Sequence, residues 1–85
     1  MTKAQAIQER VNELIVESIS KDTKGAMDRA VDEAMQLIKA EDQTGKHRRE
    51  LVRILKKWIA EWETETPGMM WPEQEIVRRL EDMTA

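Results

Sequence analysis

Hydrophobic and polar positions recur along the chain with the three-to-four-residue spacing of amphipathic α-helices. The pattern is interrupted at Asp22–Gly25, at Gly45 and at the Pro67–Gly68 pair, which are residue types that form turns or end helices. It therefore predicts an all-helical chain, with helices over about residues 3–20, 26–43, 46–65 and 72–83.

The longest helical pattern lies in the stretch from Thr44 to Thr66. Its apolar residues fall on one side of a helical wheel: Leu51, Val52, Leu55, Trp58, Ile59 and Trp62. Five cations fall on the opposite side, with no acid among them: Lys46, Arg49, Arg53, Lys56 and Lys57. We call these five residues the basic face, and at 1.5 Å per residue they cover about 16 Å of helix.

The charges at the two ends of this helix oppose its macrodipole. Cations occupy the positive N-terminal end and acids the negative C-terminal end, namely Lys46, His47, Arg48, Arg49, Glu61, Glu63 and Glu65. Pairing of the cations with Glu41 and Asp42, just before the helix, is one interpretation. The other is that the basic end binds something outside the chain.

The length of 85 residues predicts a single domain over 1–85. Because the connections are short, neighbouring helices should be antiparallel, which favours an up-down-up three-helix bundle with a short fourth C-terminal helix packed on it. The alternative is a helical hairpin that completes its core by dimerisation. A chain of this size buries only about 60% of its unfolded surface, so a second copy could add much to its stability.

The composition lacks the parts of common catalytic sites. There is no cysteine, a single histidine (His47), and no glycine-rich loop, because the three glycines are isolated at turns. We therefore expect no enzymatic activity, no metal site and no cofactor. The net charge of −3 is too small to indicate a nucleic-acid mimic.

The chain also lacks the apolar segments that direct proteins to membranes. No apolar run approaches the roughly 20 residues of a membrane span, and the charged N-terminal stretch has no apolar core of a secretory signal. These features predict a soluble protein of the cytoplasm, with no membrane among its partners.

Two surfaces are candidate binding sites. The basic face could bind phosphates or an acidic protein surface; alternatively it is a solvated surface, or it pairs with the Glu9, Glu13 and Glu17 ridge of the first helix in this or another copy. The second candidate is the apolar segment Met69, Met70 and Trp71, because methionine adapts to irregular surfaces and tryptophan is a frequent hot spot. Its alternative is that Trp71 folds back onto the bundle.

These observations predict a small helical module that binds a larger protein or nucleoprotein assembly stoichiometrically, as an adaptor, regulator or inhibitor. Accessory proteins of mobile elements often have this profile. The alternative function is that of a nucleic-acid-binding accessory protein using the basic face, largely through the phosphate backbone, since aromatic residues for base stacking are not interleaved there. A third interpretation is a homo-oligomeric structural unit.

Overall fold

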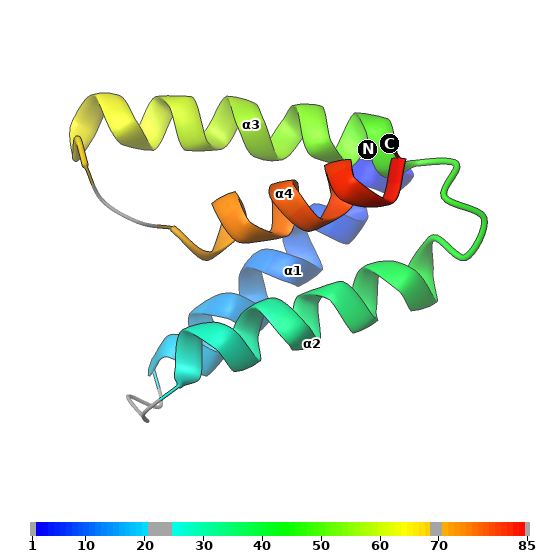
Figure 1. Cartoon of the computed structure of the whole chain (residues 1–85), viewed down its shortest axis with the longest axis horizontal. Coiled ribbons are helices and arrows are strands. Elements are labelled where there is room, and N and C mark those ends of the chain that lie inside the picture. Colours follow the sequence, from blue (N-terminus) through cyan, green and yellow to red (C-terminus); the bar gives the residue numbers. More distant parts are fainter. Residues whose placement is uncertain (1, 21–24, 69–70, 85) are drawn as a thin grey trace.

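The computed structural model describes residues 2–20, 25–68 and 71–84, and it confirms the all-helical class. Within these ranges the chain forms four helices and no strand (Figure 1). The helices are α1 (Lys3–Ser20), α2 (Ala26–Glu41), α3 (Arg48–Glu65) and α4 (Pro72–Thr84). The second helix ends two residues before, and the third begins two residues after, the position expected from the hydrophobic pattern.

Side chains next to the helix starts satisfy backbone groups that the helices leave unpaired. At α1, the Thr2 amide donates to Gln5 Oε1 (2.8 Å) and the Gln5 amide donates to Thr2 Oγ1 (3.2 Å), which is a reciprocal capping box. At α3, the His47 amide donates to both carboxylate oxygens of Asp42, at 3.2 and 3.1 Å.

The turn between α2 and α3 requires a glycine at position 45. Gly45 has φ +74°, and a Cβ there would lie 2.9 Å from the Arg48 guanidinium.

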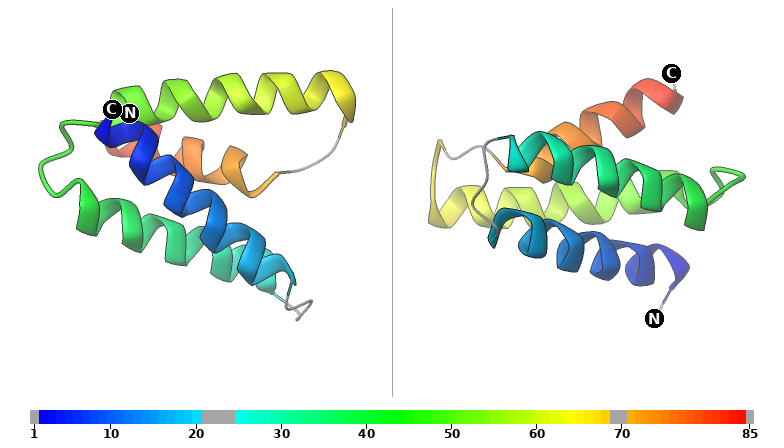
Figure 2. Two further views of the ribbon diagram at one scale, coloured as in Figure 1. Left: turned by 180° about the vertical axis from the view of Figure 1, so that it is seen from behind. Right: turned by 90° about the horizontal axis from the view of Figure 1, so that it is seen from below.

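The four helices form a ring in which α1 and α4 each pack against both α2 and α3. In Figure 1, α3 and α2 lie at opposite edges of the molecule; in the right panel of Figure 2, α1 and α4 lie on opposite faces. The chain reverses direction from each helix to the next (Figure 1). The sequence predicted a bundle of three helices with the fourth packed on it. In the structure α2 and α3 are joined mainly through their contacts with α1 and α4, so α4 is one of the helices that surround the core.

The core is apolar and receives side chains from all four helices. Its buried members are Ala4, Ile7, Val11, Ile15, Ala30, Val31, Ala34, Met35, Ile38, Leu51, Leu55, Ile76, Val77 and Leu80. Three large apolar residues of the helical pattern lie outside this core, because Ile19, Met27 and Met83 are 41–45% exposed. Each lies in the terminal turn of its helix, where fewer neighbouring side chains surround it.

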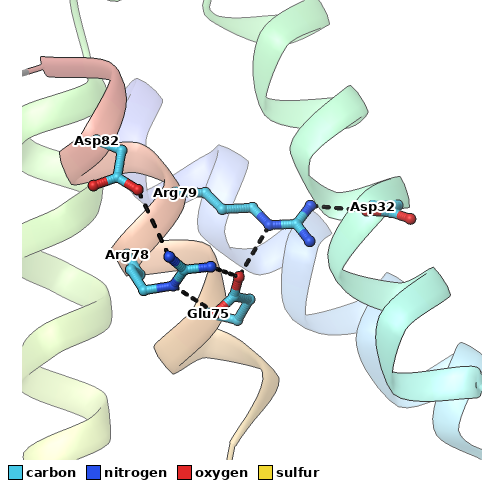
Figure 3. Close-up of polar contacts among 5 residues, drawn as sticks. All are labelled: Asp32, Glu75, Arg78, Arg79 and Asp82. Atoms are coloured by element: carbon cyan, nitrogen blue, oxygen red, sulfur yellow. Dashed lines mark hydrogen bonds and ion pairs between the residues drawn. The ribbon is translucent and has the colours of Figure 1, made fainter.

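An ion-pair network fixes α4 to α2 at the surface (Figure 3). Arg79 donates to Asp32 of α2 at 2.8 Å and to Glu75, one turn earlier on α4, at 3.2 Å. Arg78 also donates to Glu75, from Nε at 2.9 Å, and approaches Asp82 at 3.8 Å. Hydrogen bonds from Arg78, followed by those from Arg79 and the charges of both, lower the pKa of Glu75 from 4.5 to about 2.

We predict that Leu80→Ala lowers the free energy of unfolding by about 2–5 kcal/mol, the range for leucine truncation in a packed core. Leu80 has no exposed surface, so the substitution leaves a cavity among residues of other helices. Urea denaturation followed by circular dichroism would measure the change. Met83→Ala, at a position 41% exposed on the same helix, serves as the control and should change stability much less. Equal effects of the two variants would mean that α4 is not part of the core.

We further predict that the Glu75 network stabilises the fold above pH 4.5 and that this contribution is lost as pH falls towards about 2. Between these values the unfolded chain binds more protons than the folded chain, so stability rises with pH. Glu75→Gln should therefore flatten this part of the stability profile, measured by thermal unfolding across the acid range. Glu63→Gln removes an exposed carboxylate that forms no ion pair with the described residues, and should leave the profile unchanged.

Candidate functional site

The N-terminal half of the basic face forms a shallow groove on the outer side of α3. The groove has a volume of about 530 Å³ and is lined by Lys46, Arg49, Glu50 and Arg53. Because α3 is continuous from Arg48 to Glu65, Arg49 and Arg53 keep the helical spacing that the sequence predicts. Lys46 was expected at the start of this helix but lies in the turn before it. The side chain of Arg53 is 80% exposed, which leaves its guanidinium accessible to a partner.

Two of the five cations of the basic face have acidic neighbours in the same chain. Lys56 is bonded to Glu81 of α4 at 2.8 Å, and Arg53 lies 3.9 Å from Glu50. No ion pair joins Lys46, Arg49 or Lys57 to a carboxylate of the described residues. The helical wheel predicted no acid on this face. In the structure Glu50 lines the groove and Glu81 lies beside Lys56.

The acids just before α3 form no ion pair with the cations at its start. Glu41 accepts hydrogen bonds from Lys3, at 3.1 Å, and from Arg10, both on α1. The hydrogen bond from Lys3, together with the nearby Arg10, lowers the pKa of Glu41. Asp42 is buried and caps the start of α3 through the His47 amide. The first interpretation, in which Glu41 and Asp42 pair with the cations of α3, therefore finds no ion pair among the described residues.

The three tryptophans form a continuous aromatic row from α3 to the start of α4. The ring centroids of Trp58 and Trp62 are 5.7 Å apart, and those of Trp62 and Trp71 are 5.0 Å apart. All three side chains are half-buried. Trp71 thus lies against the bundle, whereas Met69 and Met70, the other two residues of the apolar candidate site, lie outside the described residues.

The start of α4 contains a carboxyl group in an unfavourable environment. Glu73 is only 4% exposed, and its Oε2 has no hydrogen-bond partner in the described part of the chain. Burial raises the pKa of Glu73, although a hydrogen bond from its own backbone amide acts in the opposite direction. The indole Nε1 of Trp71, two residues earlier, is likewise buried without a partner among described residues.

A second cleft lies where α1 and α3 pack together, and the sequence analysis did not identify it. Its volume is about 300 Å³ and it is lined by Gln5, Gln8, Glu9, Ile54 and Trp58. Gln8 is only 2% exposed. A signal for its burial exists in the sequence, because Gln8 follows Ala4 by four residues and precedes Val11 by three, both of which are core positions.

The described residues offer no metal site and no membrane-spanning helix. Among residues 2–20, 25–68 and 71–84, no cluster of three or more histidine or acidic side chains could hold a metal ion. No helix in the described ranges combines the length and apolar character needed to cross a membrane. A comparison of the chain with protein-family models, curated proteins and solved structures finds no match.

We predict that Glu73→Gln stabilises the protein at neutral pH. Since the pKa of Glu73 is raised above 4.5, the folded chain binds more protons than the unfolded chain from pH 4.5 up to the raised value. Wild-type stability therefore falls as pH rises through this window, and the neutral glutamine should abolish that fall. Thermal unfolding at several pH values measures it, with the exposed Glu13→Gln as the control. A lower stability of Glu73→Gln at neutral pH would contradict this account.

Proposed function

We propose that this protein binds an acidic surface of a larger protein through the basic face of α3 and acts by stoichiometric association. The observation that supports the proposal is the groove at the start of α3, in which Lys46, Arg49 and Arg53 face a single acid, Glu50. Lys46 and Arg49 have no ion-pair partner among the described residues, so their charges are available to a partner.

The location of the charge favours a protein partner over nucleic acid. A protein that follows a phosphate backbone needs a row of cations, each of which neutralises one phosphate. Here Lys56 is already bonded to Glu81 and Arg53 shares the groove with Glu50, so the row is short and interrupted. The whole chain is also acidic, with a net charge of −3, which opposes non-specific binding to nucleic acid.

The chemistry of the groove determines what it would recognise. Arginine guanidinium groups bind carboxylates through two parallel hydrogen bonds, so Arg49 and Arg53 suit aspartate or glutamate side chains presented one helical turn apart. Such exposed charge pairs contribute mainly to the rate and specificity of association rather than to affinity. We therefore propose a regulator or adaptor whose encounter with its partner is electrostatically guided.

We predict that Arg49→Glu slows association with the partner severalfold and makes the rate less dependent on salt, because it removes part of the attracting field. The partner is first captured from a lysate of the organism that encodes the chain, with and without nuclease, and identified by mass spectrometry. Binding of the purified partner is then followed by surface plasmon resonance at several salt concentrations.

Lys39→Glu is the matched control, since it makes the same change in charge at an exposed position of α2 that has no ion pair with described residues. Wild-type association by Arg49→Glu would refute the assigned site. Capture that is lost on nuclease treatment, with steep loss of affinity in salt, would instead support the nucleic-acid-binding alternative.

A further inference from the structure

The cleft between α1 and α3 is lined by a largely buried polar side chain that makes no hydrogen bond within the described residues. Gln8 lines the cleft, is 98% buried, and makes no hydrogen bond with any described residue. Its amide atoms are not among the fully buried atoms that lack a partner, so they are open to the cleft and can bond a molecule that enters it. Its carboxamide presents one acceptor oxygen and an NH₂ donor group.

The other residues of the cleft define the chemistry of the missing partner. Glu9 is exposed at its rim and forms no ion pair with the described residues, so it favours a cation and disfavours an anion. The half-buried indole of Trp58 and the side chain of Ile54 supply an apolar wall. An aromatic ring beside a carboxylate suits a planar cation, which can stack on the ring while it donates hydrogen bonds.

The side-chain NH₂ groups of Gln5 and Gln8 suit a cation that is carried by a peptide, since a peptide also supplies carbonyl acceptors. Gln5 Oε1 already accepts the Thr2 amide, so Gln5 offers mainly its NH₂ group, and Gln8 offers a second one. A guanidinium group only donates and would pair with Glu9 and with Gln8 Oε1. The two NH₂ groups then remain free to donate, and a main-chain carbonyl next to the cationic side chain is a suitable acceptor.

We propose that the α1–α3 cleft binds an arginine side chain of a partner protein. The guanidinium lies between Glu9 and Trp58, its oxygen acceptors are Glu9 and Gln8, and the adjoining peptide carbonyl accepts from Gln5 or Gln8. This site is separate from the basic face, since it selects a cation rather than an acid. It assigns the buried Gln8 a partner and the unpaired Glu9 a counter-charge.

The test uses the full-length ¹⁵N-labelled protein and, as the probe, arginine capped by an acetyl and an N-methylamide group. Two-dimensional NMR follows the side-chain NH₂ signals of Gln8 and the indole signal of Trp58. We expect saturable shifts of these signals at millimolar probe. Capped citrulline, which keeps the planar shape but has no charge, should bind about tenfold more weakly, which corresponds to about 1.4 kcal/mol.

Two acids on α1 provide a matched pair of variants. Glu9→Gln should weaken binding of capped arginine about tenfold, whereas Glu13→Gln, at an exposed position outside the cleft, should bind as the wild type does. Gln8→Met conserves volume and removes both polar atoms, so it should abolish the shifts while a thermal melt reports folding. If Gln8→Met does not fold, the comparison of Glu9→Gln with Glu13→Gln still decides the question.

The inference would be overturned by no saturable shift with capped arginine, by equal binding of capped citrulline, or by wild-type binding of Glu9→Gln. Much tighter binding of free arginine than of capped arginine would also overturn it, because the ligand would then be the amino acid and not a protein side chain. Arg49→Glu should leave this titration unchanged, so failure of the arginine site and failure of the proposed function are distinguishable.

Discussion

Burial of Leu51 and Leu55 on one side of α3 fixes the rotation of that helix, and both candidate sites depend on this rotation. The two leucines have no exposed surface and lie in a core to which α1 and α4 also contribute. With this side turned inward, the groove with Arg49 and Arg53 must open on the outer side, and Ile54 must lie at the edge next to α1. A rotation of one residue step, about 100°, would bring charged side chains into the core.

Much of the helical structure follows from local sequence signals. The breaks at Gly45 and at Pro67–Gly68, together with Pro72 at the first position of α4, are local features that predict where helices end and begin. The acidic partners of the basic face were not predictable in the same way. Glu81 approaches Lys56 only because α4 packs against α3, a tertiary contact between residues 25 positions apart. Hydrophobic periodicity describes one helix at a time, so it does not predict which residues of two helices come into contact.

The burial of Gln8 shows a related limit of sequence reasoning. On a helical wheel Gln8 lies among the core positions of α1. Because glutamine is polar, residue type alone would predict that Gln8 is exposed. The same applies to Glu73, which satisfies the preference for acids in the first turn of a helix and is nevertheless buried. In both cases local propensity and tertiary position conflict, and such conflicts are expected at functional or strained sites.

The two candidate sites on α3 differ in sign, and this difference restricts the kind of partner. The outer groove presents Lys46, Arg49 and Arg53, whereas the α1–α3 cleft presents Glu9 beside Trp58. A uniformly charged polymer would be attracted by one site and repelled by the other. A protein surface with a basic residue beside an acidic patch is complementary to both sites. A wrong partner with the opposite arrangement of charge would be repelled at both sites. The two sites that we propose are therefore better suited to selective recognition of a folded protein than to general electrostatic adhesion.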